Sequence, residues 1–458
     1  MQRVLQLLAV ASSVLSGAMH MPDAAKIVNH GLIINTAKGP ASVIVEPVDH
    51  FGDDDVVHSI RHLHNIRPEG HTSGRGPAYV AARNISEGDS IVSLPLASIM
   101  SSKTAAEGRI QALLLANPDL PNAVVLALHV LEEKFKGADS KWFSFLRSLP
   151  KTLRGTIYLP DDEIDLIEGS QLHRLTRARF EAISTFYDAL HGPLTSNAMD
   201  PPLFRQLDFT LESFKWALSI VWAHAILVPT TSQANPADVE AFLVPMVSTM
   251  GHSATARNHF DVNYETQTFT MVATQRYGVG DPVVINLGDN SMTLYMLNYG
   301  FCGDPSHLDT LPLAIQVEAS DPLLKFKTSI LEMINSTMEA PYELGLDAPL
   351  PASMLQSMRI KVMTSAEIGA YDAAIGMERI GLRNEYALSR ALLRTTGAML
   401  DAYAYPLDEM RRVLRTLEGR SRDLARTVIH EQEILSATMA AVREHWHGLL
   451  LDAAFVPT

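Results

Sequence analysis

The sequence predicts an α+β chain in which a β-rich unit is interrupted by a long helical insert and followed by an all-helical unit. Three observations lead to this expectation. Short apolar segments separated by polar turns, typical of strands, lie between residues 74 and 99 and again between residues 238 and 301. From about residue 105 to residue 225 the apolar residues recur at helical spacing instead. After about residue 311 that helical spacing continues almost to the C-terminus.

Both β-rich stretches are expected to contain a hairpin. In the first, the apolar residues 79–82 and 91–95 flank a polar turn that contains Gly88. In the second, residues 260–264 and 268–272 are separated by a three-residue polar turn. Because apolar strands joined by a short polar turn are typical of antiparallel pairs, we expect each pair of segments to form one hairpin.

The helical insert and the C-terminal unit show apolar stripes on one face of a helix. One stripe in the insert consists of Val124, Val125, Leu128 and Leu131. A second consists of Leu218, Val221, Trp222 and Ala225. Asp321 and Pro322 suit the N-cap and the first position of a helix. Further helices are expected over residues 354–363, 384–403, 407–417 and 420–446.

The composition and the net charge of the chain indicate which classes of partner it can bind. At 458 residues, with 47% hydrophobic and 19% charged residues, the chain resembles a globular protein long enough for more than one domain. Its formal net charge is −14, and it contains no dense run of Lys or Arg. A nucleic-acid binder usually carries a basic patch or stripe. We therefore expect no nucleic-acid partner. The acidic charge favours solubility, and steering of a basic protein substrate is the alternative.

Two features of the sequence point to different cellular locations for the chain. Cys302 is the single cysteine, so no intramolecular disulfide can form, which favours a reducing compartment. Residues 1–18, however, contain Arg3, a largely apolar run, and then small residues at Ser16 and Ala18, which is typical of a secretory leader. We expect a signal peptide or leader that directs the chain to the secretory pathway or to an organelle such as a plastid. A cytoplasmic chain with a short apolar N-terminal helix is the alternative.

The remaining N-terminal residues, 19–65, are expected to form an exposed, partly helical lead-in. His58 and His62 have the one-turn spacing of a metal-binding pair, but no cysteine or His-Glu-x-x-His pattern accompanies them. We therefore favour the absence of a metal site. No segment after the leader has the roughly 20 apolar residues that a membrane span needs, so we expect no transmembrane segment.

Single motifs do not identify a functional site. In Gly74-Arg75-Gly76, two glycines let the backbone approach a ligand closely, but such a triplet alone is more typical of a turn. His252 alone fits a semi-buried histidine, and Tyr299 alone fits a core aromatic. The order and spacing of the motifs carry more information than any one of them.

In that order, the motifs closely resemble the SET domains of the class typified by Rubisco large-subunit and actin-histidine methyltransferases. The resemblance covers most of residues 70–445. In the SET domain it rests on residues 74–76, 84–89, 93–96, 141–150, 163–172, 214–222, 244–253, 280–288 and 297–301. In the helical region that follows, it rests on residues 321–322, 355–359, 384–385 and 429–435.

The resemblance implies a function and a domain plan. It implies a protein N-methyltransferase that uses S-adenosylmethionine, with lysine favoured as the target and histidine as the alternative. It also implies a SET domain over residues 66–305, with the insert at about 105–225, and a helical substrate-binding domain over residues 306–450. The helical domain would hold the protein substrate or partner. Orientation, desolvation of the attacking nitrogen and polar stabilisation of the methyl group would supply the catalysis.

The resemblance also assigns roles to individual residues. Tyr299 takes the position of a catalytic aromatic, and Leu287 that of the family's catalytic tyrosine. The cofactor-binding positions are Gly74, Arg75, Gly76, His224, Ser248, Gly251, His252 and Phe301.

Four of these positions depart from the family pattern. Ser248 stands where the family has Asp, Gly251 where it has Asn, and Leu287 where it has Tyr. His224 stands where an arginine often pairs with the cofactor carboxylate, and a neutral imidazole does this less well than a guanidinium. Because one lost polar contact in an active site lowers the rate by about 10²–10³, the strip is expected to be degraded.

Three interpretations follow from these departures. The first is an active methyltransferase with weakened turnover. The second is a SET-derived pseudoenzyme that binds a protein partner through its helical domain. The third is an unrelated α+β protein whose motif matches arose by chance.

Overall fold

The computed structural model describes residues 45–46, 65–72, 75–196, 201–229, 239–257, 259–315 and 317–451. The chain forms two compact units, each discontinuous in sequence. Of the described residues, the first contains those up to Tyr158 together with those within 177–290 and 298–300. The second contains the described residues within 159–176, 291–297 and 301–451. The domain limits inferred from the sequence stay a prediction.

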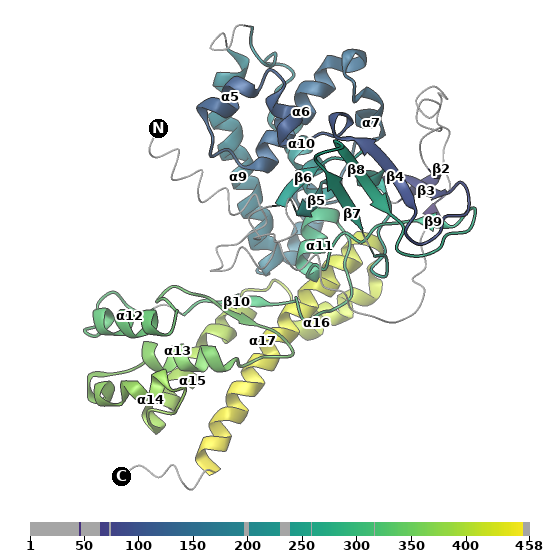
Figure 1. The fold of residues 1–458 in the computed structure, drawn as a ribbon. Coiled ribbons are helices and arrows are strands. Elements are labelled where there is room, and N and C mark those ends of the chain that lie inside the picture. The colour runs from purple at the N-terminus through teal and green to yellow at the C-terminus, as the bar shows by residue number, and fades with distance from the viewer. Residues whose placement is uncertain are drawn as a thin grey trace. The chain divides into compact units, whose positions relative to one another are not determined.

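Small antiparallel sheets build the β-rich part of the first unit (Figure 1). A four-stranded sheet has the order β1 (Val45–Glu46), β2 (Ile66–Thr72), β3 (Gly76–Ala81) and β9 (Pro282–Val283). A three-stranded sheet has the order β4 (Ser90–Pro95), β8 (Thr268–Val272) and β7 (Phe260–Asn263). A two-stranded sheet pairs β5 (Ile226–Pro229) with β6 (Val239–Phe242). Apolar residues of these strands and of the segments beside them form one buried core, which includes Val92, Phe269 and Ile285.

One of the two expected hairpins forms. β7 and β8 pair antiparallel across their short turn, as their local alternation predicts. The expected pairing of β3 with β4 is wrong, because β3 pairs with β2 and β9 while β4 pairs with β8. The turn between them bonds to a distant segment instead: Ile85 bridges Tyr277, and the Gly88 amide donates to the Ala273 carbonyl. This pairing places the two strands in different sheets.

The helical insert is confirmed and has a core of its own. Its two expected stripes lie on α6 (Asn122–Lys136) and α10 (Leu211–His224), which pack side by side (Figure 1). A capping box starts α10, because Thr210 and Ser213 each accept the other's backbone N–H. The other helices between residues 102 and 195 are α4 (Ser102–Ala106), α5 (Gln111–Ala116), α7 (Phe143–Ser148), α8 (Asp161–Ile167) and α9 (Gln171–Thr195). Of these, α8 and the first residues of α9 belong to the second unit.

The second unit is mainly helical, as expected. The 33-residue helix α17 (Gly419–Leu451) runs antiparallel to α15 (Leu382–Asp401), since Glu385 contacts His445 near one end and Tyr403 contacts Glu431 at the other. The other helices are α11 (Met292–Tyr299), α12 (Leu324–Met333), α13 (Ala352–Lys361), α14 (Tyr371–Ile375) and α16 (Leu407–Val413). β10 (Leu311–Leu313) and β11 (Tyr342–Leu344) form one antiparallel pair. The α+β fold class is therefore confirmed.

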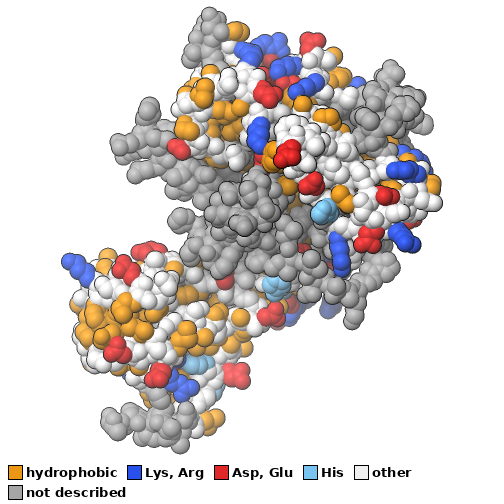
Figure 2. All heavy atoms as spheres, viewed as in Figure 1, with side chains coloured by type: hydrophobic (Ala, Val, Ile, Leu, Met, Phe, Trp, Pro, Cys, Tyr) orange, Lys and Arg blue, Asp and Glu red, His pale blue; other side chains and the backbone are white. Residues whose placement is uncertain are grey.

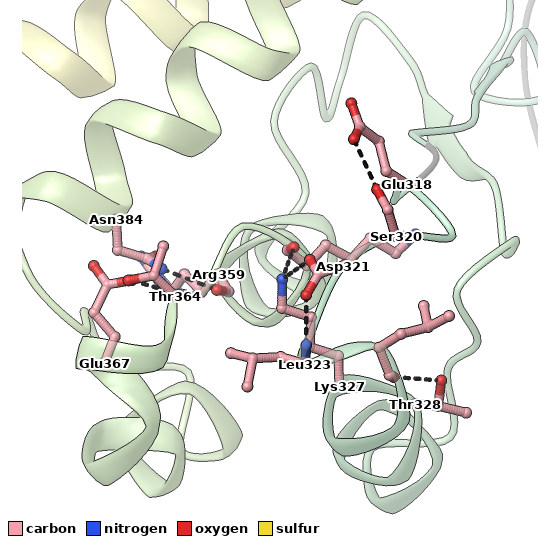
Figure 3. Close-up of polar contacts among 12 residues, drawn as sticks. Glu318, Ser320, Asp321, Leu323, Lys327, Thr328, Arg359, Thr364, Glu367 and Asn384 are labelled. Carbon is pink, nitrogen blue, oxygen red and sulfur yellow. Dashed lines mark hydrogen bonds and ion pairs between the residues drawn. The ribbon is translucent and has the colours of Figure 1, made fainter.

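Polar contacts fix the start of α12, and they correct one expectation (Figure 3). Asp321 is not the N-cap, because the helix begins at Leu324. Its carboxylate instead accepts the backbone N–H of Leu323 at 2.7 Å and pairs with the buried ammonium of Lys327 at 2.6 Å. Lys327 also donates to the carbonyl oxygen of Lys361 at the end of α13. The buried cation is satisfied by these two acceptors, which joins α12 to α13.

Glu431 ties the sequence-distant segments of the second unit together. Its carboxylate is buried on α17 and accepts the backbone N–H groups of Gln171 at 2.8 Å and Leu172 at 3.3 Å. It also accepts the hydroxyls of Tyr403 at 3.0 Å and Thr293 at 3.3 Å. Burial nevertheless raises the pKa of Glu431 above its ordinary value. Residues from three stretches of sequence therefore meet at one carboxylate.

Several expectations concern residues outside the described ranges. These are the leader, nearly all of the 19–65 lead-in with His58 and His62, and Gly74. Within the described ranges, no helix combines the length and apolar character that a membrane crossing requires. No group of three His, Cys, Asp or Glu side chains in that part of the chain could hold a metal ion. On the face drawn in Figure 2, acidic and basic side chains are both scattered among hydrophobic ones.

Candidate functional site

Arg75 lies at the centre of the predicted strip in the first unit. Its side chain is buried, with 6% of the residue exposed. The guanidinium donates to three carbonyl oxygens: Nη1 to Ala223 at 2.6 Å, Nη2 to Ser248 at 3.0 Å and Nε to Met250 at 2.9 Å. The residue before β3 thus holds the end of α10 and the loop that follows β6. Each bond from a charged donor typically contributes about 1.5–3 kcal/mol.

Gly76 allows the close approach that places Arg75. Its φ of +121° lies in a region that favours glycine. A Cβ atom there would lie 3.2 Å from both the Ser148 carbonyl oxygen and the Thr249 Cβ. From the sequence we expect these glycines to let the backbone approach a ligand, and that stays a prediction; at Gly76 the close neighbours are Ser148 and Thr249 of the chain itself.

Ser248 organises the loop after β6 rather than leaving its hydroxyl free. The residue is fully buried, and its Oγ accepts the backbone N–H of Val244 at 2.8 Å. Its carbonyl oxygen accepts both from Arg75 and from Nδ1 of His224, at 2.8 Å. The preceding turn is strained, because Met246 has a φ of +68°. Ser248 therefore performs a local structural role in this loop.

His224, the last residue of α10, is a buried neutral imidazole. Nδ1 donates to the Ser248 carbonyl, so that nitrogen carries the proton and Nε2 is an acceptor. Nε2 is buried and has no hydrogen-bond partner. Burial and the nearby charge of Arg75 lower the pKa of His224 to about 3. The ring is 1% exposed, and its unpartnered nitrogen is a polar group for which the described chain supplies no donor.

His252 and Leu287 meet where two chain segments pair. His252 bridges Ile285 in parallel, and the Leu287 amide donates to Nδ1 of His252 at 3.2 Å. The Gly251 carbonyl accepts the Ile285 amide at 2.9 Å. Burial and the charge of Arg75 lower the pKa of His252 to about 4, so this ring is neutral as well. The Leu287 side chain packs against the apolar core of the sheets.

The Tyr299 ring lies near the guanidinium of Arg75, and Arg179 on α9 is a second positive charge that acts on it. The Arg75 guanidinium carbon is 5.6 Å from the centre of the Tyr299 ring. Arg179, 2% exposed, stacks over Trp222 at 4.4 Å, and its charge also acts on Tyr299. Burial lowers the pKa of Arg75 to about 10 and that of Arg179 to about 9, which leaves both charged at neutral pH. Sequence reasoning missed Arg179, because an arginine in a helix usually faces solvent.

The predicted site residues are therefore only partly brought together. Arg75, Gly76, His224, Ser248, Gly251, His252, Leu287 and Tyr299 belong to the first unit. Phe301 belongs to the second, where its ring lies 5.3 Å from that of Tyr295.

The electrostatics of the cluster suit an anionic group. The acceptors of Arg75 are neutral carbonyl oxygens, and no carboxylate among the described residues pairs with it. A guanidinium has five N–H groups, so these three bonds leave two. Because an uncompensated buried charge is unfavourable, a carboxylate beside Arg75 would be stabilised. The orphaned nitrogen of His224 can accept a bond from an ammonium group of the same ligand.

Comparison with known proteins agrees with this fold. Residues 318–435 match the family described as Rubisco LSMT substrate-binding. The structure titled as the SET domain of LSMT bound to lysine and AdoHcy superposes with a TM-score of 0.72 at 20% identity, covering 87% of this chain and 92% of that one. Rubisco LSMT bound to AdoMet gives a TM-score of 0.71 at 21% identity, covering 87% and 93%.

The chain has the fold of the LSMT SET-domain proteins. Among curated relatives, the actin-histidine N-methyltransferase of Homo sapiens is 23% identical over 353 residues, and that of Gallus gallus is 22% identical over 351 residues. Both alignments cover 73% of this chain and 58% of the relative. The chain thus spans a little over half the length of these relatives. The class that the sequence motifs resemble is confirmed at the level of fold and of the C-terminal domain.

Proposed function

We propose that the chain is an S-adenosylmethionine-dependent protein N-methyltransferase that acts on lysine, with turnover lowered by the loss of polar groups. The observation that carries this proposal is the uncompensated buried charge of Arg75, with His224, His252 and Tyr299 around it. The relatives named above, which are methyltransferases, support the same reaction class.

The residues present fit the amino-acid end of S-adenosylmethionine. The charge of Arg75 suits its carboxylate, and Nε2 of His224 suits its ammonium group. When bound, this cofactor supplies an electrophilic methyl group. Gly251, between Met250 and His252, adds no side chain to this segment of the chain. In this arrangement Arg75 supplies the positive charge for the carboxylate, which the neutral imidazole of His224 does not carry.

The positive field favours lysine over histidine as the target. A lysine amine must lose its proton before it can attack, and nearby cations lower the pKa of an ammonium group. Arg75 and Arg179 are two buried cations beside Tyr299. An imidazole is already neutral at pH 7 and gains less from such a field. Tyr299 retains a hydroxyl for polar stabilisation, whereas Leu287 offers none.

Calorimetry with S-adenosylmethionine tests the cofactor assignment. We expect heat of binding, and absence of binding at millimolar cofactor would overturn the proposal. Labelled cofactor incubated with a cell lysate then tests methyl transfer. A labelled protein band is the expected result, and binding without any labelled band would establish the alternative below.

A SET-derived pseudoenzyme is the second candidate, and Leu287 is the observation that favours it. Its half-buried side chain packs against the apolar core and offers no hydroxyl at the position where the family resemblance implies a tyrosine. Restoring the family pattern with Leu287→Tyr and Gly251→Asn should raise transfer if decay from an active ancestor explains the strip. The exposed Leu227→Tyr is the matched control and should leave transfer unchanged.

We also propose that residues 1–18 direct the chain to the secretory pathway or an organelle, on the basis of their leader-like pattern. Residues 1–30 fused to a fluorescent protein test this, and a diffuse cytosolic signal would refute it.

A further inference from the structure

The solvent face of α15, in the second unit, carries an unusual run of arginines. Arg383, Arg390 and Arg394 are exposed and lie on one side of the helix with Tyr386. The opposite side is buried and includes Leu388 and Leu392. Between the buried Glu385 and Asp401, α15 contains no acidic residue. A solvated helix face usually interleaves both signs at i, i+4 spacing, and this one does not.

Two of the three arginines of this face are not neutralised by any described residue. Arg383 pairs with Glu367 at 3.2 Å, next to the Thr364–Glu367 capping box drawn in Figure 3. Neither Arg390 nor Arg394 has an ion pair or hydrogen bond with any described residue. The whole chain carries a net charge of −14. The face is thus a local positive region on an acidic protein.

The face is also hollowed and has an aromatic rim. The half-buried Ala387 and Ala391 lie between the arginines, and together these side chains line a hollow of about 520 Å³. Tyr386, 51% exposed, packs against Trp446 of α17 with ring centres 5.3 Å apart. Small residues leave room for a partner's side chains, and the aromatic pair offers an apolar contact. Aromatic residues and arginine are the types enriched in protein interfaces.

We propose that this face, Arg383, Tyr386, Ala387, Arg390, Ala391 and Arg394, docks an acidic segment of a protein partner. From Arg383 to Arg394 the helix rises about 17 Å, which matches about five residues of extended peptide. Carboxylates at alternate positions would meet the arginines, and an apolar side chain between them would enter the hollow. Arginine favours such contacts because its planar fork binds a carboxylate through two N–H groups. The acidic balance of the chain disfavours a long polyanion such as RNA, which would be repelled outside this short face.

This inference goes beyond the proposed reaction, because docking at α15 requires neither the cofactor nor methyl transfer. It therefore has its own test by direct binding. The full chain is titrated against a fluorescent peptide of about eight residues that alternates Glu with Leu and Phe, and binding is followed by anisotropy. A peptide with Gln in place of every Glu is the ligand control.

We expect saturable binding of the acidic peptide that falls steeply at about 1 M salt, where the screening length is about 3 Å. The double substitution R390E/R394E should weaken binding by about tenfold or more. The matched control is R412E/R415E, which makes the same charge change on exposed arginines of α16 and the turn after it and should leave binding unchanged. Tyr386→Ala should weaken binding while leaving all three arginines in place.

Three outcomes would overturn the inference. Equal weakening by R390E/R394E and R412E/R415E would show an effect of net charge alone. Equal affinity for the Glu and Gln peptides would remove the charge argument. Tighter, R390E/R394E-sensitive binding of a single-stranded RNA oligonucleotide would assign the face to nucleic acid. All substituted residues are exposed, so circular dichroism should show unchanged folding.

Discussion

Arg75 is the residue that most strongly determines the character of the candidate site. Its guanidinium is held by carbonyl oxygens alone, and its charge helps to keep two neighbouring imidazoles neutral. A residue between two glycines would ordinarily be expected in an exposed turn. Here the side chain turns inward and becomes both a structural tie and the positive charge of the site.

Replacing Arg75 with Met should therefore destabilise the first unit. The substitution removes three bonds from a charged donor and leaves the carbonyls of Ala223, Ser248 and Met250 short of a partner. We expect the free energy of unfolding to fall by about 2–5 kcal/mol, measured by urea denaturation. Arg205→Met at the surface should change it by less than about 1 kcal/mol. Equal stability of the two variants would contradict the tie assigned to Arg75.

His252 predicts a loss of stability in acid. Its pKa is lowered to about 4 in the folded protein, so the unfolded chain binds a proton more readily below the ordinary value of 6.5. Stability should be fully present above that value and should decrease as the pH falls toward 4. His252→Asn keeps an acceptor for the Leu287 amide and cannot titrate.

Denaturation midpoints measured across this pH range should show a shallower decline for His252→Asn than for the native chain. The exposed His447→Asn serves as the control and should leave the decline unaltered. Parallel profiles for all three proteins would exclude His252 as a source of the acid sensitivity.

At the scale of elements, the turn between α8 and α9 depends on a glycine that has almost no space around it. Gly169 has a φ of +83°, and a Cβ atom there would lie 2.0 Å from the carbonyl oxygen of Ala402. Both segments belong to the second unit. The start of α9 and the loop after α15 are therefore in direct backbone contact.

Gly169→Ala should destabilise this unit by about 2–5 kcal/mol, because neither the backbone angle nor the space admits a side chain. Gly192→Ala, within α9, meets no atom within 4 Å and should instead stabilise the helix by about 0.5–1 kcal/mol. Thermal unfolding of the two variants compares a crowded with an open glycine. A Gly169→Ala protein as stable as Gly192→Ala would argue against the contact with Ala402.

Elements were predictable where their signal is local. The pairing of β7 with β8 and the apolar faces of α6 and α10 follow from neighbouring residues. The pairing of β3 with β9 joins Tyr79 to Val283, and nothing near either residue encodes its partner. The start of α12 was misplaced because Asp321 forms a bond with Leu323 that resembles a cap, and its pairing with Lys327 is tertiary.

The sequence predicts most of the residues that form the candidate site, but it does not predict which of them are charged. Motif order selected Arg75, His224, Ser248 and His252, which the structure gathers in one cluster. Which of them carry charge depends on burial, which spacing does not reveal. Arg179 was missed for the same reason, since its burial arises from Trp222 on another helix.

At the scale of the whole molecule, the two units are not separable at a single point in the sequence. The carboxylate of Glu431 needs the backbone of Gln171 and Leu172 and the hydroxyl of Thr293, all from the N-terminal side of residue 306. Expressed alone, residues 306–458 would bury this carboxylate with only Tyr403 as a partner. We expect that fragment to lack the cooperative unfolding transition of the second unit in the full chain, as measured by circular dichroism.

The full chain, prepared in parallel, is the control for that measurement. A fragment that unfolds cooperatively at the same denaturant concentration would show that Glu431 does not require its N-terminal partners.

The helix α9 limits how the two units can be exchanged between proteins. Its first residues, 171–176, are counted with the second unit and the remainder with the first. Moving residues 301–458 alone to another protein would leave Gln171, Leu172 and Thr293 behind and so separate Glu431 from these partners. We therefore expect the second unit to be transferable only on a continuous stretch from residue 159 onward, which carries residues 177–290 of the first unit with it.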